Sequence, residues 1–461
     1  MFEASVYVAR RKRLREQVKD GVVLWLGHAL QPRTYPANTY RFRQHAHFLY
    51  FVGLNEPELA VLSWMDRERN VLFAAPVTMD DIVWSGPLPT PAERAARAGI
   101  TETRAPADLG QVVGELKAQG VPIHYLTPFQ ADAKLRLAAL LGVAPGDLAA
   151  GESPALKRAV VDQRLRKTAA EVAEMEEALG ITKQMYARAM ALTKPGVREA
   201  EIAGAMQGIA LSHDRAQCFQ PIVTVRGQIL HNESYDGVLR SGQLLLVDSG
   251  AESPNGYASD ITRTFPVDGK FTPRQRELYE VCLAMQLHAI DHARPGTSNL
   301  ELHLGAARTL AQGLVDLKLM KGDPAAAVEA GAHALFFPHG LGHMMGLDVH
   351  DMEDLGDIVG YGEGVRRSEQ FGLGFLRMSR KLEPGFVFTV EPGIYFNPPL
   401  IDQWRGEGRH RDFIDYDRVE TYKDFGGIRI EDDVLITDDG KRVLGPPIPK
   451  TAAEVEAAVG K

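Results

Sequence analysis

Short apolar runs separated by polar helical stretches fill the first third of the chain. Three such runs lie at residues 22–26, 61–64 and 71–75, and each is rich in Val, Leu or aromatic residues. Runs of this length and composition predict buried strands. Because helical stretches alternate with them, we expect an α/β domain over residues 1–166. No glycine-rich phosphate loop joins a strand to a helix here, which argues against a nucleotide site.

Residues 40–54 form an unusually aromatic and basic stretch within this first domain. Two interpretations stay open. The stretch can be a core strand with one hydrated edge, or part of an interface or substrate path.

Helix signals indicate a second domain over residues 167–461. Thr168 and Glu171 form a capping box, in which a hydroxyl and a carboxylate satisfy the first free amides of a helix. A second start follows at Thr272, with Pro273 at the first helical position. Cys282 falls on the apolar face of that second helix, so we expect it in the core.

Strand patterns in this second domain carry acidic residues into apolar surroundings. Strands are predicted over residues 220–225, 229–233, 244–248, 257–265, 385–391 and 427–431. Four of their carboxylates are Asp248, Asp260, Glu391 and Glu431. Residues 396–425 are charged and aromatic without a clear period, which indicates a long loop or insertion.

The segment Phe337–Asp351 holds three histidines and two aspartates in a background of small and apolar residues. His339 and His343 are four residues apart, as helical zinc ligands are. However, Pro338 precedes them, glycines interrupt them, and the glutamate of the helical zinc motif is absent. We therefore expect an extended segment whose glycines let the backbone approach a ligand closely.

Composition narrows the functional classes. The 461 residues are 45% hydrophobic and 24% charged, with a net charge of −8. The acidic balance argues against nucleic-acid binding, and no apolar run reaches the length of a membrane span. The N-terminus lacks a secretory pattern, and two distant cysteines suit buried thiols in a reducing compartment. We expect a cytoplasmic protein.

Four buried carboxylates in one neighbourhood need partners, since an unpaired buried charge is costly. The histidine segment has no lysine or arginine to supply them. A pair of divalent cations about 3.5–4 Å apart would satisfy the carboxylates together. Oxygen-rich ligands favour Mn²⁺ over a thiolate type of zinc site, with Zn²⁺ or Co²⁺ as alternatives. The competing interpretation is that the acids are scattered strand-end residues in ordinary salt bridges.

These residues carry a family resemblance. The acids and histidines stand within the segments Gly256–Phe265, His339–His343, Thr389–Gly393 and Arg429–Asp432, in that order after Asp248. The pattern resembles the proline-specific metallopeptidases of the pita-bread fold, aminopeptidase P and prolidase. The resemblance covers the whole second domain. It extends more loosely to the first domain through residues 40–57 and Trp84-Ser85-Gly86. The turn between Asp248 and Asp260 is one residue longer than the family pattern.

The resemblance implies a pita-bread catalytic domain after a creatinase/prolidase type of N-terminal domain. It also implies a role for each matching residue. The metal ligands would be Asp248, Asp260, His343, Glu391 and Glu431. The catalytic residues would be His339, His350, Glu391 and Arg429, with Glu391 carrying protons and His350 stabilising the oxyanion.

Substrate-binding roles are implied for His231, Tyr257, Arg377, Tyr395 and Trp84. His231 would line the proline pocket, and Tyr395 would handle protons beside Arg429. Arg377 sits where prolidases capture the free carboxylate of a dipeptide, although a surface arginine is an equal alternative. Trp84 would close the active site of a neighbouring subunit, which requires a homo-oligomer, a dimer or a tetramer.

The expected activity is that of an Xaa-Pro aminopeptidase acting on short peptides with proline in second position. An Xaa-Pro dipeptidase using Arg377 is the alternative. Two rivals of the same fold are a non-catalytic binding module and a metal-free creatine-type amidinohydrolase. Both rivals are disfavoured because all five ligand positions are present.

Overall fold

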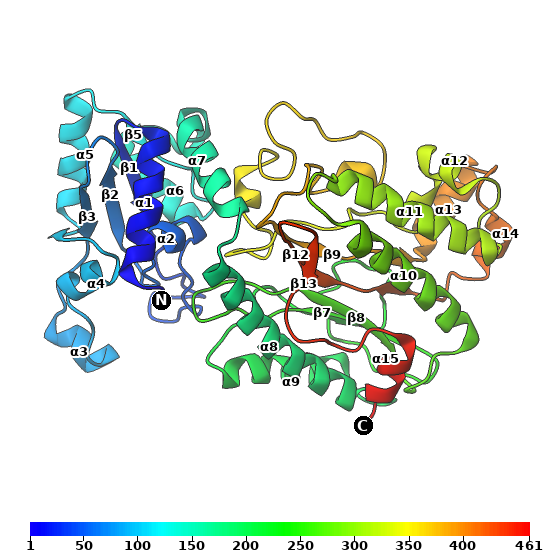
Figure 1. Cartoon of the computed structure of the whole chain (residues 1–461). Helices are drawn as coiled ribbons and strands as arrows, with labels where there is room; N and C mark the ends of the chain where they lie inside the picture. The colour runs from blue at the N-terminus through cyan, green and yellow to red at the C-terminus, as the bar shows by residue number, and fades with distance from the viewer. The chain divides into compact units, whose positions relative to one another are not determined.

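The computed structural model describes residues 1–461, which divide into two compact units, Met1–Arg164 and Leu165–Lys461 (Figure 1). The boundary predicted from the sequence, at residue 166, lies two residues later. No helix combines the length and the apolar character that crossing a bilayer requires.

A five-stranded mixed sheet forms the centre of the first unit. The strand order is β4-β3-β2-β1-β5, with β1, β2 and β3 antiparallel and the two edge strands parallel to their neighbours. The strands are β1 (Val22–Leu26), β2 (Ala60–Trp64), β3 (Asn70–Phe73), β4 (Glu102–Arg104) and β5 (Ile123–His124). The three strands predicted from apolar runs are confirmed as its three central members.

The helices of the first unit are α1 (Ala4–Val18), α2 (Ala46–Phe51), α3 (Met79–Ser85), α4 (Pro91–Arg97), α5 (Asp108–Ala118), α6 (Ala131–Leu141) and α7 (Pro154–Leu165). Helices α5 and α6 pack against the sheet, whereas α3 buries no residue. Leu24 and Phe73 of the sheet belong to one buried cluster with Val113 of α5 and Leu137 of α6. Burying a side chain of this size contributes about 1.5–3 kcal/mol, so this cluster accounts for much of the stability of the unit.

Of the two interpretations left open for residues 40–54, the core strand is wrong, because part of this stretch forms α2; the interface or substrate-path role stays a prediction. All six residues of α2 are buried. A helix that is buried on every side has no polar face, and therefore lacks the 3.6-residue period that identifies a helix in a sequence.

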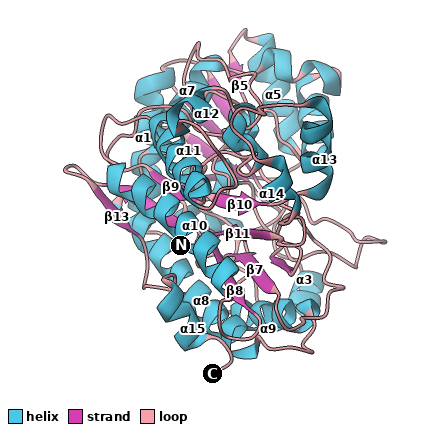
Figure 2. Cartoon of the chain, turned by 90° about the vertical axis from the view of Figure 1, so that its right-hand side faces the viewer, coloured by secondary structure: helices cyan, strands magenta, loops and turns pink.

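Paired helices cover the sheets of the second unit, as Figure 2 shows for α8 with α9 and for α10 with α11. Its helices are α8 (Ala169–Leu192), α9 (Glu199–Ser212), α10 (Pro273–His292), α11 (Asn299–Asp316), α12 (Pro324–Glu329), α13 (Pro398–Glu407), α14 (Tyr416–Glu420) and α15 (Ala452–Ala458). The capping boxes predicted at Thr168 and Thr272 are present. Cys282 is buried as expected, whereas Cys218 is only partly buried; both thiols are free.

Three small antiparallel sheets lie inside these helices. The first is β6-β7-β8, the second is β13-β12-β9, and the third pairs β10 with β11. The strands are β6 (Ile222–Thr224), β7 (Leu244–Ser249), β8 (Ile261–Pro266), β9 (Val387–Val390), β10 (Gly393–Tyr395), β11 (Gly427–Arg429), β12 (Asp432–Ile436) and β13 (Lys441–Val443). The amide of Glu431 donates to the carbonyl of Thr262 at 3.0 Å, which joins the β11–β12 connection to β8. The acidic strand ends of separate sheets therefore meet.

Two predictions about the second unit are wrong. Residues 396–425 are not a long loop, because they contain α13 and α14. Asn397 caps α13 and Pro398 starts it, but the helix is too short to show a clear period. Residues 229–233 are turns and irregular chain rather than a strand.

Candidate metal centre

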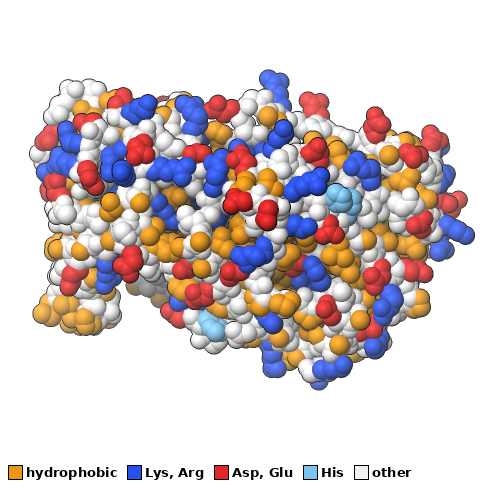
Figure 3. Space-filling view, in the orientation of Figure 1, with side chains coloured by type: hydrophobic (Ala, Val, Ile, Leu, Met, Phe, Trp, Pro, Cys, Tyr) orange, Lys and Arg blue, Asp and Glu red, His pale blue; other side chains and the backbone are white.

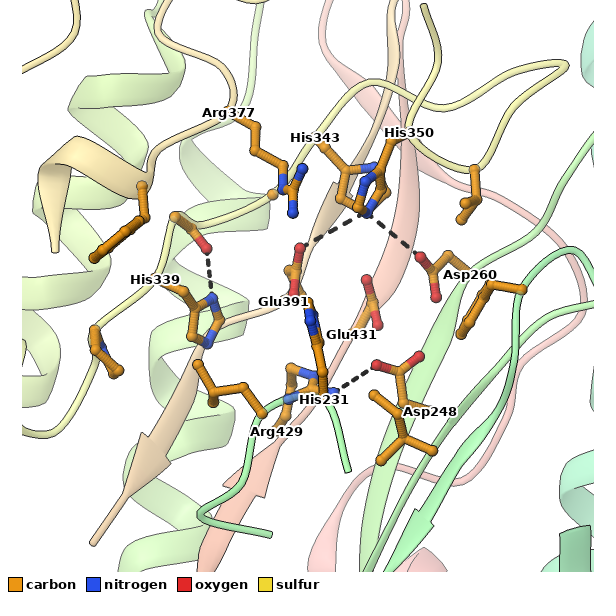
Figure 4. A pocket seen from close by; sticks show the side chains of 18 of the residues that line it. His231, Asp248, Asp260, His339, His343, His350, Arg377, Glu391, Arg429 and Glu431 are labelled. Carbon is orange, nitrogen blue, oxygen red and sulfur yellow. Dashed lines mark hydrogen bonds and ion pairs between the residues drawn. The ribbon is translucent and has the colours of Figure 1, made fainter. Parts of the chain in front are cut away.

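A cavity of about 650 Å³ opens where these sheet ends meet. Figure 4 shows acidic, histidine and arginine side chains converging on it. The polar residues that line it are Gln220, His231, Glu233, Asp248, Asp260, His339, His343, His350, Arg377, Glu391, Asn397, Arg429 and Glu431. Apolar side chains, including Phe219, Leu230 and Phe371, form part of its wall.

Strand ends position the four acids. Asp248 lies in β7 opposite Thr262 of β8, and Asp260 directly precedes β8. Glu391 directly follows β9, and Glu431 follows β11 by two residues. The sequence therefore brings the acids together by antiparallel pairing, although they span more than 180 residues of chain.

The donor atoms of three of these residues lie close enough to share one ion. Asp260, His343 and Glu431 each offer an atom within 4.8 Å of the other two. His343 Nε2 lies 3.4 Å from Asp260 Oδ2 and 3.7 Å from Glu391 Oε1. One carboxylate oxygen each of Asp248 and Asp260 is buried without a hydrogen-bond partner. Oxygen-rich donors left without a partner are what a hard divalent cation requires, so the residues fit such ions.

The acids repel one another in the absence of a cation. Burial and the neighbouring Glu431 raise the pKa of Asp260 well above its ordinary value. Burial and the neighbouring Glu391 do the same to the pKa of Glu431. Burial raises the pKa of Glu391 to about 8. These shifts indicate more negative charge than the protein compensates.

Arg429 is the buried cation beside these acids. Its guanidinium donates to a carboxylate oxygen of Asp248, to Thr262 Oγ1 at 3.1 Å and to the Tyr395 hydroxyl at 3.0 Å. The Thr262 hydroxyl in turn donates a hydrogen bond to Glu431 Oε2 at 2.6 Å. Arg429 therefore orients ligands on both sides of the centre, as hydrogen-bonding partners of metal ligands do.

The hydrogen bonds of His339 define its tautomer. Its Nδ1 lies 2.8 Å from the Gly340 carbonyl, which only accepts, so Nδ1 carries the proton. Its Nε2 then accepts from the Tyr395 hydroxyl at 2.9 Å. Burial, and next the charge of Arg429, lower the pKa of His339 to about 3. His339 is therefore a neutral imidazole that lines the cavity.

A backbone ladder places His343 beside Glu391. The Thr389 amide donates to the His343 carbonyl at 2.9 Å, and the Glu391 amide donates to the Leu341 carbonyl at 2.8 Å. A Cβ at Gly342 would lie 1.9 Å from the Thr389 carbonyl oxygen. This glycine is required for close approach to β9, whereas the sequence analysis assigned the close approach to a ligand.

His350 belongs to a chain of charged groups at the cavity rim. Its Nδ1 lies 2.6 Å from Glu353 Oε2, and its ring centroid lies 4.1 Å from that of His343. Arg377 donates to the other oxygen of Glu353. Sequence reasoning missed Glu353, although its position three residues after His350 was an available signal.

Asp433 was also missed. Its buried carboxylate accepts the Asp260 amide at 3.1 Å and so holds the backbone of a ligand. The acidic run Glu431-Asp432-Asp433 was its signal in the sequence. Alternation along β12 places neighbouring acids on opposite sides, and Asp432 instead pairs with Arg263 at 2.7 Å.

Two of the predicted substrate-binding residues lie elsewhere. Tyr257 is buried, is not among the residues that line the cavity, and donates to Glu171 at 2.8 Å, so its substrate-binding role stays a prediction. It stands in the turn that joins two strands, where the hydroxyl anchors the chain to α8. Tyr395 lies behind His339 and Arg429 rather than at the cavity wall.

Trp84 belongs to the first unit, on the exposed helix α3. Its side chain is 87% exposed, and Met79 and Val83 of the same helix are also exposed. Figure 3 shows hydrophobic side chains gathered over α3 at the lower left. A helix that exposes several large apolar side chains and buries none of its residues is typical of a contact surface.

A buried ion pair supports the histidine segment from behind. Lys167 Nζ lies 2.8 Å from Asp351 Oδ2, and both side chains are only 1% exposed. Asp351 also accepts the Asp348 amide at 3.3 Å. The pair therefore ties the start of the second unit to the turn that carries His350.

We expect Lys167→Met to destabilise the protein by about 3–5 kcal/mol, because it removes the cation of a fully buried pair. Chemical denaturation followed by circular dichroism measures the change. Arg442→Met, which removes an exposed pair with Glu176, is the control and should change stability by less than about 1 kcal/mol. Equal effects of the two substitutions would contradict a structural role for the buried pair.

The chain is similar in sequence to known peptidases. Residues 173–438 match the model of metallopeptidase family M24, and residues 7–124 match the aminopeptidase P N-terminal domain. The Xaa-Pro aminopeptidase of Escherichia coli is 33% identical over 463 residues, covering 97% of this chain and 96% of that protein. A probable Xaa-Pro aminopeptidase of Fusarium vanettenii is 32% identical over 87% of this chain and 83% of its own length.

Solved structures of aminopeptidase P have the same fold as this chain. A glutamate-to-alanine variant of E. coli aminopeptidase P in complex with substrate superposes with a TM-score of 0.81 at 30% identity, over 99% of this chain and 98% of that chain. The Pseudomonas aeruginosa aminopeptidase PepP gives the same values. The predicted combination of an α/β N-terminal domain and a pita-bread catalytic domain is confirmed. The chain belongs to metallopeptidase family M24, and it carries the N-terminal domain of aminopeptidase P.

Proposed function

We propose that this protein is an Xaa-Pro aminopeptidase, which hydrolyses the bond between an N-terminal residue and a following proline. The observation that carries the proposal is the convergence of five ligand-type side chains, two of them with an unpartnered carboxylate oxygen, in one peptide-sized cavity. The proline preference is supported by the names of the relatives and by the apolar wall beside His231. Short peptides with proline in second position are the proposed substrates.

The proposed ligands of two divalent ions, Mn²⁺ first among them, are Asp248, Asp260, His343, Glu391 and Glu431. Such ions would polarise the scissile carbonyl and make water a nucleophile near neutral pH. Glu391 lies at the edge of this group, with its Oε1 3.7 Å from His343 Nε2, and is proposed also to carry a proton during hydrolysis.

His350 is proposed to stabilise the oxyanion. Its Nδ1 lies 2.6 Å from Glu353 Oε2, so this carboxylate holds the ring at the cavity rim. When both ring nitrogens carry a proton, Nε2–H would donate to the developing negative charge. His339 lines the cavity and is fixed in place by its hydrogen bond with Tyr395 behind it. His231 lines the cavity beside Leu230.

Arg377 decides between the two proposed substrate lengths. Its side chain is 34% exposed at the cavity and already contacts Glu353. This partner reduces the net positive charge that a dipeptide carboxylate would meet, which supports the aminopeptidase. The dipeptidase alternative is supported by the position of the Arg377 guanidinium at the cavity. The partly exposed ion pair with Glu353 contributes only about 0–1 kcal/mol, so Arg377 could release Glu353 and bind the carboxylate of a dipeptide instead.

We expect the Mn²⁺-supplemented protein to cleave both an Xaa-Pro dipeptide and an Xaa-Pro-Xaa tripeptide, with a higher kcat/KM for the tripeptide. Arg377→Ala should lower kcat/KM for the dipeptide selectively if the guanidinium captures its carboxylate. Parallel assays of both peptides with both proteins measure these effects. Equal losses on the two peptides would refute carboxylate capture, and no cleavage of either peptide would refute the proposed function.

The exposed apolar surface of α3 supports a homo-oligomer in which Trp84 approaches the cavity of another subunit. The two free thiols support the reducing cytoplasm as the compartment.

A further inference from the structure

A second cavity, of about 300 Å³, lies wholly within the first unit. One side is formed by Val8, Arg11 and Arg15, which occupy successive turns of α1. The other side is formed by Glu68 and Asn70 at the start of β3 and by residues 99–101 after α4. None of these residues belongs to the candidate metal centre.

Two arginines line this cavity with little compensating negative charge. Arg11 is 1% exposed, and its terminal nitrogens donate to the neutral carbonyls of Phe51 and Ala98, both at 2.6 Å. The nearest acid is Glu68, whose carboxylate lies 3.8 Å from Arg15 and whose side chain is 74% exposed. The cavity therefore carries net positive charge.

Three polar atoms of the lining are buried without a hydrogen-bond partner. Two are donors, Arg11 Nε and a terminal nitrogen of Arg15. The third is an acceptor, the side-chain oxygen of Asn70. Leaving such a group without a partner costs about 1–3 kcal/mol, and more where the group is charged. A ligand that offers acceptors and one donor would satisfy all three atoms.

The electrostatics of α1 agree with this geometry. Burial, and next the charge of Arg15 one turn away, lower the pKa of Arg11 to about 10. An anion between the two guanidinium groups would offset both effects, since planar guanidinium groups bind oxyanions through paired N–H donors.

We propose that this cavity binds inorganic phosphate as hydrogen phosphate. Its anionic oxygens accept from Arg11 and Arg15, and its P–OH group donates to Asn70. Sulfate has the same shape and charge but no proton near neutral pH, so it would leave Asn70 without a donor. A simple carboxylate shares that defect.

Binding of inorganic phosphate to the full-length protein, measured by isothermal titration calorimetry with sulfate in parallel, tests the proposal. Because phosphate also binds metal centres, the titration is repeated with Asp260→Ala. We expect one phosphate site that persists in Asp260→Ala and weakens at least about tenfold in Arg15→Gln. Loss of the site in Asp260→Ala, or its persistence in Arg15→Gln, would overturn the proposal.

Asn70→Ala separates phosphate recognition from general anion attraction. The native protein should bind phosphate more tightly than sulfate, and Asn70→Ala should bring the two affinities to near equality. Equal affinities in the native protein would refute the role of Asn70. Peptidase activity should be unchanged in Arg15→Gln and Asn70→Ala, which reports on their folding. Glycerol phosphate, whose dianion has no P–OH group, should bind more weakly than inorganic phosphate; binding of equal strength would contradict the role of the P–OH group.

Discussion

Asp260→Ala and Glu431→Ala are each expected to abolish binding of a metal pair and to lower peptidase activity more than about 100-fold. Substituting even the outer partners of metal ligands typically costs about 10–100-fold, and these two carboxylates lie in the group of atoms closest to a shared ion. Metal content by mass spectrometry, Mn²⁺ titration and kcat/KM measure the effect.

Glu280→Ala is the matched control, because Glu280 is an exposed glutamate on α10. It should leave metal content and activity unchanged. Either ligand variant with two bound ions and full activity would refute the proposed ligand set. Circular dichroism should show that both variants fold, since each substitution removes one of several mutually repelling buried acids.

Metal-free protein is expected to lose stability as the pH rises from about 5 to about 8. The buried Glu391 has a pKa of about 8 against an ordinary value of 4.5. Below pH 4.5 the group is protonated in both the folded and the unfolded state, so folding carries no ionisation cost. Above that pH the unfolded chain ionises first, and stability falls until the pH passes about 8.

The loss should be a few kcal/mol, at about 1.4 kcal/mol for each pKa unit. Thermal unfolding of EDTA-treated protein between pH 5 and pH 8.5 measures it. Adding Mn²⁺ should remove most of the decline, because cations take the place of protons among the carboxylates. Glu391→Gln should make the profile of the metal-free protein less steep, although Asp260 and Glu431 keep their own contribution, and Glu280→Gln should leave the slope unchanged. A profile as steep in Glu391→Gln as in the native protein would refute the assignment.

Local patterns predicted the elements whose stabilising contacts are close in sequence. The capping boxes at Thr168 and Thr272 lie within three residues of their partners, and both begin the expected helices. The short apolar runs of the first unit became its central strands because burial on both faces favours such runs. Helices α2 and α13 were missed because neither shows the local period of a helix: α2 is buried on every side, and α13 is short.

The acids and His343 were the part of the candidate site most accessible from the sequence. Buried carboxylates in apolar strands need a compensating charge wherever the chain places them, so their composition alone indicated cations. Residues that position other site residues were harder to predict from the sequence. Glu353 and Asp433 stand near His350 and Glu431 in the chain, but their contacts with Arg377 and the Asp260 amide depend on the fold.

The sequence by itself determined the kind of chemistry, because residue type decides which groups can hold a cation or a proton. Only the tertiary structure decided which of those groups meet. It excluded Tyr257 from the cavity, placed Tyr395 behind His339, and showed that Gly342 serves the contact with β9. The physical reason is that strand pairing and side-chain direction depend on contacts between residues far apart in the chain, and a single sequence does not record those distances.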